Sequence, residues 1–275
     1  MKTIKWLFST ALLIGLFLTA CNKDSTTDLT DDSQQQLMTS EDQTTVSDLY
    51  EDVSDQVDDA IETRGGGAND CPTVTVEPDD GSYPRTITID YGTDGCEGPN
   101  GRIRKGQIVV TVSDTMSNEG AVRTVTFVDF SIDDAQIEGT KTLTNLGYDA
   151  DNNVTFNRTV TGGQITFPNG DVATWEADHT MTQVAGGNTP FIWDNIFEIT
   201  GGSSGVNRNG KAYTVEIITP LVKKRSCPWI VAGVKSLTLD DKTVIINYGE
   251  GECNRKALVT LPNGTQKIII IHRWW

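Results

Sequence analysis

From Cys71 onward, short runs of valine, isoleucine, threonine and aromatic residues alternate with polar residues, and this alternation constrains the fold most strongly. It places successive side chains on opposite faces of a strand. Turn-forming residues separate the runs, and Pro168-Asn169-Gly170 and Pro262-Asn263-Gly264 are typical of hairpins. The runs are residues 86–91, 107–113, 123–132, 136–144, 154–161, 163–167, 172–182, 197–201, 212–218, 235–239, 243–248, 256–261 and 267–272. The sequence therefore predicts an all-β body that folds as an antiparallel meander.

The number of predicted strands limits how the body can be arranged. About a dozen strands exceed what one open sheet usually holds without curling. We therefore expect a two-sheet sandwich, a barrel-like roll or an elongated twisted sheet. All-β domains of about 200–250 residues occur, so residues 68–275 are predicted to form a single all-β domain.

Two matching units lie near the start and the end of the body. In each, a Cys-Pro pair precedes a strand that ends in Asp/Asn-Tyr-Gly, and a second cysteine lies five residues beyond the tyrosine. The repeat selects the disulfides Cys71–Cys96 and Cys227–Cys253 among three possible connectivities. Each would stabilise the fold by about 3 kcal/mol in the chain-entropy model. Metal ligation is the alternative, but no Cys-x-x-Cys or Cys/His spacing supports it, and no metal site is predicted.

The first residues have the pattern of an export signal. Lys2 and Lys5 precede an apolar run, residues 6–18, which is short for a transmembrane helix. The run ends in Leu18-Thr19-Ala20-Cys21, which resembles the lipobox of bacterial lipoproteins. We predict that residues 1–20 are removed and that acyl chains on Cys21 anchor the chain to a membrane. The alternatives are a membrane-spanning N-terminal helix and an ordinary secretory signal.

The negative charge of the chain is concentrated after the anchor. The net charge is −16, and residues 22–64 contain thirteen acidic residues against two basic ones. Residues 21–44 offer almost nothing to bury and are predicted to be a disordered tether. Within residues 45–64, apolar residues recur every three or four positions from Val46 to Ile61, so an acidic amphipathic helix is predicted. We expect its acidic face to be solvated and its apolar stripe to pack on the β body; docking to a partner is the alternative.

The complete arrangement of lipobox, acidic stalk and two Cys-Pro…Tyr-Gly…Cys units resembles a family of uncharacterised Bacteroidota outer-membrane or surface lipoproteins. The resemblance covers most of the chain and carries no known activity. It implies a location at the outer membrane. Lys23 followed by Asp24 resembles in part the surface-export signal of such lipoproteins, so both periplasmic and surface orientations stay open.

No catalytic or cofactor motif is identified in the sequence, and no cofactor is predicted. The chain has two histidines, and Glu176-Ala177-Asp178-His179 is the best local cluster. On a strand the two carboxylates would face away from His179, which is poor geometry for joint ligation. Asp149-Ala150-Asp151 begins like a calcium loop but lacks the required glycine and glutamate, so a solvated turn is preferred.

Exposed tryptophans on a β body can stack on sugar faces. Trp193, Trp274 and Trp275 are the candidate glycan-stacking residues. The alternative is that tryptophans belong to the core, which we prefer for Trp175 and Trp229. The acidic charge argues against nucleic acid as a partner.

Three functional hypotheses follow. The first is a non-enzymatic envelope or surface lipoprotein with a binding or structural role, which binds a glycan or a protein. The second is a polysaccharide-acting hydrolase with a carboxylate pair in a sheet cleft. The third is a carrier that shields an apolar ligand.

Overall fold

The computed structural model describes residues 29–63, 71–98, 101–187, 189 and 191–271. The predicted lipidation site Cys21, the signal segment and two candidate glycan-stacking residues, Trp274 and Trp275, lie outside the described residues. None of the helices within the described residues combines the length and the apolar character that a membrane span requires.

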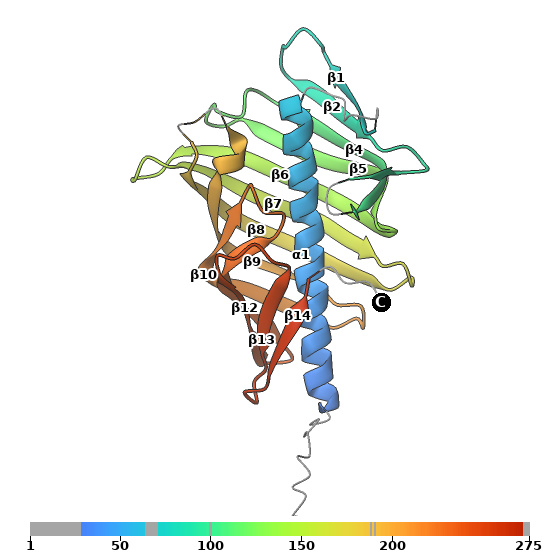
Figure 1. Ribbon diagram of the computed structural model, residues 1–275, viewed down its shortest axis with the longest axis vertical. Helices are drawn as coiled ribbons and strands as arrows, with labels where there is room; N and C mark the ends of the chain where they lie inside the picture. Colours follow the sequence, from blue (N-terminus) through green and yellow to red (C-terminus); the bar gives the residue numbers. More distant parts are fainter. Residues whose placement is uncertain (1–28, 64–70, 99–100, 188, 190, 272–275) are drawn as a thin grey trace, which may run out of the picture.

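One antiparallel sheet follows one long helix, α1 (Asp31–Thr63), which confirms the predicted all-β meander with a preceding helix (Figure 1). The strands are β1 (Thr73–Glu77), β2 (Arg85–Asp90), β3 (Cys96–Glu97), β4 (Ile103–Val112), β5 (Val122–Ile132), β6 (Ala135–Tyr148), β7 (Val154–Thr166), β8 (Val172–Ala185), β9 (Ile196–Val206), β10 (Ala212–Lys224), β11 (Ile230–Leu239), β12 (Lys242–Glu250), β13 (Lys256–Thr260) and β14 (Gln266–Ile270). Each strand pairs with its neighbours in chain order, except that β3 pairs only with β4, beside β2. A 3-10 helix, η2 (Ile192–Asp194), interrupts the connection from β8 to β9.

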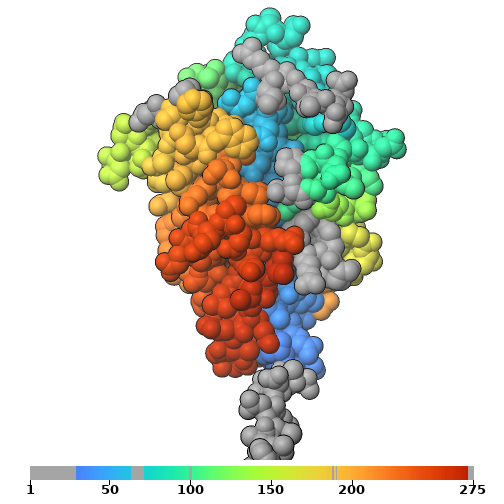
Figure 2. Space-filling view, viewed as in Figure 1, coloured from blue at the N-terminus to red at the C-terminus, as the bar shows by residue number. Residues whose placement is uncertain are grey.

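The sheet curls around α1, so that the helix lies along its concave face (Figure 1). In the space-filling view, parts of α1 are visible between the first and the last strands (Figure 2). Glycine bulges help the strands to bend. Gly139, for example, interrupts the register between β6 and β7 with a φ of 113°, and a Cβ there would lie 2.8 Å from the carbonyl oxygen of Gly162.

Buried apolar side chains join the helix to the sheet. Val46, Leu49, Tyr50, Val53 and Val57 of α1 belong to the same buried cluster as side chains of β2 and β4–β8. Buried side chains of β9–β14 form a second cluster, and Leu29 and Leu37 near the start of the helix pack against it. The predicted apolar stripe therefore packs on the chain's own β body.

The helix begins at Asp31, so the prediction that residues 21–44 are a disordered tether and that the helix starts at residue 45 is wrong for residues 31–44. Thr30 caps the helix, because its hydroxyl accepts the backbone N–H of Ser33 at 3.3 Å. The added turns have no apolar stripe. Their polar side chains are buried instead: Thr39 accepts a hydrogen bond from Asn207 at 2.7 Å, and Gln43 accepts one from Lys235 at 2.8 Å.

The two predicted disulfides are present, with Cα–Cα distances of 5.9 Å for Cys71–Cys96 and 5.7 Å for Cys227–Cys253. The first ties the segment before β1 to β3. The second ties the loop before β11 to the loop after β12. In both units of the sequence repeat, the disulfide thus joins the segment before the first strand to the cysteine that follows the second strand.

Candidate functional site

The acidic face of α1 packs against cations of the sheet and of its connecting segments, and most of the paired carboxylates are buried. The prediction that this face is solvated is therefore wrong. The pairs are Asp42 with Arg208, Asp48 with Arg102, Glu51 with Arg158, Asp52 with Arg102 and Arg104, Asp55 with Lys223 and Arg225, Asp58 with Arg123, and Asp59 with Arg225. The arginine nitrogens of Arg102 and Arg104 lie 2.6–3.1 Å from their carboxylate oxygens. Since a lone buried ion is costly, each partner makes the burial of the other possible.

The pKa values of two carboxyl groups in the centre of this network, Glu51 and Asp55, are shifted in opposite directions. Burial disfavours the charged form of Glu51, but Arg158 and the nearby lysines together outweigh that effect and lower its pKa to about 2. At Asp55, burial outweighs the attraction of Lys223 and Arg225 and raises the pKa to about 6. Glu51 is therefore a fixed negative charge at neutral pH.

No carboxylate of the described residues lies within ion-pair distance of two buried lysines on the sheet, Lys141 and Lys235. Lys235 donates to Gln43 and lies 5.0 Å from the ring centre of Tyr248. Lys141 donates to the backbone oxygen of Tyr50 at 2.7 Å and to the hydroxyl of Ser54. Burial lowers the pKa of each ammonium to about 7.

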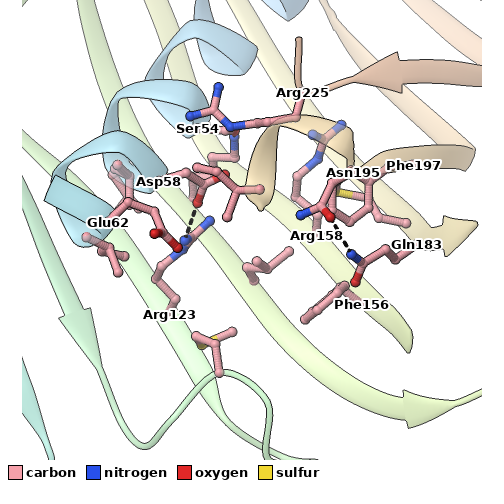
Figure 3. Close-up of a pocket in the computed structure, with 18 residues that line it drawn as sticks. Ser54, Asp58, Glu62, Arg123, Phe156, Arg158, Gln183, Asn195, Phe197 and Arg225 are labelled. Carbon is pink, nitrogen blue, oxygen red and sulfur yellow. Dashed lines mark hydrogen bonds and ion pairs between the residues drawn. The ribbon is translucent and has the colours of Figure 1, made fainter. Parts of the chain in front are cut away.

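A cavity of about 270 Å³ lies between the last turns of α1 and the concave face of β5–β9 (Figure 3). Its apolar wall consists of Val57, Ile61, Met116, Val125, Leu143, Phe156, Met181, Ile192 and Phe197. Its polar wall consists of Ser54, Asp58, Glu62, Arg123, Lys141, Arg158, Gln183, Asn195 and Arg225. Most of the apolar side chains are half-buried, which means that α1 leaves them uncovered.

The register of the sheet explains why charged and apolar groups adjoin here. Lys141 and Leu143 are two residues apart on β6 and so face the same side. Leu143 is paired with Arg158 of β7, and Phe156 of β7 is paired with Met181 of β8. Cations and apolar side chains thus alternate within each row across the strands: Leu143 lies between Arg123 and Arg158, and Lys141 lies between Val125 and Val160.

The segment around η2 borders the cavity. Asn195 accepts a hydrogen bond from the side chain of Gln183 at 2.9 Å, as Figure 3 shows. The backbone N–H of Arg225 donates to the carbonyl oxygen of Asn195 at 2.9 Å. The guanidinium of Arg225 lies 4.9 Å from the ring centre of Trp193. This side of the cavity is thereby fastened to β8 and to the end of β10.

Trp193 is 57 % exposed, and Arg225 covers one face of its ring. It is not among the side chains that line the cavity, nor does it line a second hollow of about 310 Å³ between the β6–β7 turn and the β8–β9 connection. That second hollow is lined mainly by polar residues, with Tyr148 at its edge. Trp175, preferred as a core residue, is buried.

The other residues considered in the sequence do not form one site. His179 is buried beside Arg158, with 3.2 Å between Nδ1 and a guanidinium nitrogen. Glu176 accepts the backbone N–H of Gly162 at 2.8 Å, and Asp178 accepts the side-chain amide of Asn157 at 2.7 Å. Burial lowers the pKa of His179 to about 3, so its ring is neutral. Asp149 accepts backbone hydrogen bonds within the β6–β7 turn.

No group of three or more His, Cys, Asp or Glu side chains among the described residues could hold a metal ion. The residues that sequence reasoning missed are the cations that line the cavity. Their signal is the occurrence of Lys141, Arg158 and Arg123 at positions that share a face with apolar neighbours, where a buried strand would ordinarily carry another apolar residue.

Comparison of the chain with protein-family models, with curated proteins and with solved structures finds no match.

We predict that Asp52→Asn destabilises the fold by about 3–5 kcal/mol, because it leaves Arg102 and Arg104 buried without their shared carboxylate. Denaturant unfolding measures the change. Asp134→Asn is the matched control: its side chain is 70 % exposed and pairs with Lys105 on the surface, so a change of at most about 1 kcal/mol is expected. Equal effects of the two substitutions would contradict the buried network.

We predict that Lys235→Met reduces the pH dependence of stability between about pH 7 and 10. The pKa of Lys235 is about 7 in the fold and 10.5 when unperturbed, so between these values the unfolded chain binds the additional proton. The contribution of neutral, buried Lys235 to the free energy of unfolding is complete above the unperturbed pKa. It is lost as the pH falls to the pKa of about 7 in the fold. The slope of unfolding free energy against pH should therefore fall by up to about 1.4 kcal/mol per pH unit. Lys105→Met, at a half-exposed lysine that pairs with Asp134 on the surface, is the control for the loss of a lysine. An unaltered slope in Lys235→Met would refute the prediction.

Proposed function

We propose that this chain is a lipid-anchored envelope protein that binds a small, partly apolar ligand in the cavity between α1 and β5–β9, without catalysing a reaction. The observation that carries the proposal is the gathering of half-buried apolar side chains beside the end of α1. A soluble body ordinarily covers such a group of side chains, and a concave apolar site with a few polar groups is the usual form of a ligand pocket.

The anchor is supported by the export signal and by the lipobox-like sequence that ends in Cys21. The two disulfides agree with export, because such bonds persist outside the reducing cytosol. We place the protein at the outer membrane, with the β body facing the periplasm or the cell surface. Because the proposed lipid anchor attaches the chain to the membrane, the cavity is not needed for membrane attachment and can bind a soluble molecule.

The cavity supports binding better than hydrolysis. Glycoside hydrolysis uses two carboxyl groups that flank the scissile bond. The carboxylates that line the cavity in the described part of the chain, Asp58 and Glu62, both come from α1. The carboxylate of Asp58 also forms an ion pair with Arg123, with 2.7 Å between the nearest atoms. A glycan partner at Trp193 has weaker support, since that ring lies outside the cavity.

The anchor predicts that Cys21→Ser abolishes lipid attachment. Labelled palmitate should be incorporated into the wild-type chain and not into the variant, and the variant should leave the membrane fraction. Incorporation of label into the variant would contradict lipidation at Cys21. Protease treatment of intact cells then distinguishes the orientations, because a β body on the cell surface is degraded and a periplasmic one is protected.

The cavity predicts that an uncharged apolar dye, N-phenyl-1-naphthylamine, becomes fluorescent on binding to the chain from residue 22, which retains α1 and the sheet. Leu143→Trp should weaken dye binding about tenfold or more, because the larger side chain occupies the cavity.

Leu146→Trp is the matched control, since Leu146 lies on the same strand, β6, and is exposed outside the cavity. It should leave dye affinity unchanged. An equal loss in both variants, or dye binding that survives Leu143→Trp in a folded protein, would place the ligand elsewhere.

A further inference from the structure

Lys141 differs from every other cation that lines the cavity. Arg123, Arg158 and Arg225 each lie 2.5–2.7 Å from a carboxylate oxygen of α1. The Lys141 ammonium instead has two neutral oxygen partners on α1, the backbone oxygen of Tyr50 and the hydroxyl of Ser54. An ammonium has three donors, so one hydrogen of Lys141 is left for a further acceptor.

The lining of the cavity carries more positive than negative charge. Four cations line it, against the two carboxylates Asp58 and Glu62. The three arginines are already paired with α1. Among the described residues, two lining charges remain without an ion pair: Glu62 is exposed, whereas Lys141 is buried. In the buried part of the cavity, charge complementarity therefore favours a ligand with a single negative charge.

The apolar wall begins next to this ammonium. Leu143 is two residues beyond Lys141 on the same face of β6, and Phe156 and Met181 form the neighbouring cross-strand pair. A volume of about 270 Å³ is slightly below the usual range for ligand pockets, which is about 300–1,000 Å³. The space suits one short chain better than a lipid with several chains.

We propose that the cavity takes a single-chain amphiphilic carboxylate, with its carboxylate at Lys141 and its hydrocarbon chain against Leu143, Phe156 and Met181. This inference rests on the proposed function, because it names the class of ligand for the same site. The carboxylate accepts a charge-assisted hydrogen bond from Nζ, and the chain covers the apolar side chains that α1 leaves open.

Binding of such an anion is coupled to a proton. Burial, with a smaller contribution from Arg158 and against the opposing effect of Glu51, lowers the pKa of Lys141 to about 7 in the free protein. The other groups that face the ammonium are Tyr50 and Ser54 from α1, with the charges of Arg123 and Asp58 nearby. A bound carboxylate favours the protonated amine, so binding at about pH 8 takes up a proton from solvent.

The test compares three ligands of equal chain length, decanoate, 1-decanol and decyltrimethylammonium, by titration of the chain from residue 22 at about pH 8. Decanoate should bind about tenfold or more tightly than decanol, the size expected for a hydrogen bond between charged groups. Decyltrimethylammonium should bind most weakly. Calorimetry in buffers of different ionisation enthalpy should show proton uptake with decanoate and none with decanol.

Lys141→Met should reduce decanoate affinity to that of decanol and leave decanol affinity unchanged. Lys235→Met is the matched control, since Lys235 is an equally buried lysine on the same sheet but does not line the cavity. It should preserve the preference for decanoate. If Lys141→Met does not fold, proton uptake by the wild-type chain still decides the matter.

Equal affinity for decanoate and decanol, a preference for the cationic ligand, or decanoate binding without proton uptake would overturn the assignment of the anionic head while leaving a binding cavity. Failure of all three ligands and of the uncharged dye would overturn the proposed function as well. The two failures are thus distinguishable.

Discussion

The structure depends on the pairing of one acidic helix with the cationic concave face of one curled sheet. Burying a single carboxylate or guanidinium in this interior would cost several kcal/mol, so neither surface is stable alone. Together, Asp48 and Asp52 of α1 satisfy Arg102 and Arg104 of the sheet, and Glu51 satisfies Arg158. The apolar stripe from Val46 to Val57 contributes area, while the ion pairs determine where along the groove the helix lies, because a shifted helix would leave charges buried without partners.

This dependence explains why the sheet can remain open and curled. A meander of this length has one face that must be covered, and a second sheet is the common solution. Here one helix covers it. Bulges such as that at Gly139 bend the strands, so a single helix contacts β8 as well as β11 and β12. The first disulfide lies beside the edge strand β1, and the second joins the loops that flank β11 and β12, two strands in from the edge strand β14.

The sequence predicted what alternation, turn residues and the internal repeat encode: the meander, its hairpins, both cysteine pairs and the apolar stripe of the helix. It did not predict that α1 begins at Asp31, because Thr39, Asp42 and Gln43 are buried by hydrogen bonds to distant loops and strands, and such contacts leave no periodic signal. The cavity was also missed. Its lining comes from α1, five neighbouring strands and connecting segments, and Lys141 is recognisable as unusual only when the helix opposite it is known.

The cavity arises where the match between helix and sheet ends. Along α1, acidic residues at intervals of three to four positions meet cations in turn, from Asp48 through Asp55 to Asp58. Opposite Lys141 the helix presents Ser54, which supplies a hydroxyl and no charge. A carboxylate at that position would complete the series of ion pairs, whereas serine leaves one buried ammonium with neutral partners beside uncovered apolar side chains. A single departure from the helix's acidic pattern therefore accounts for both the place of the cavity's binding group and its sign.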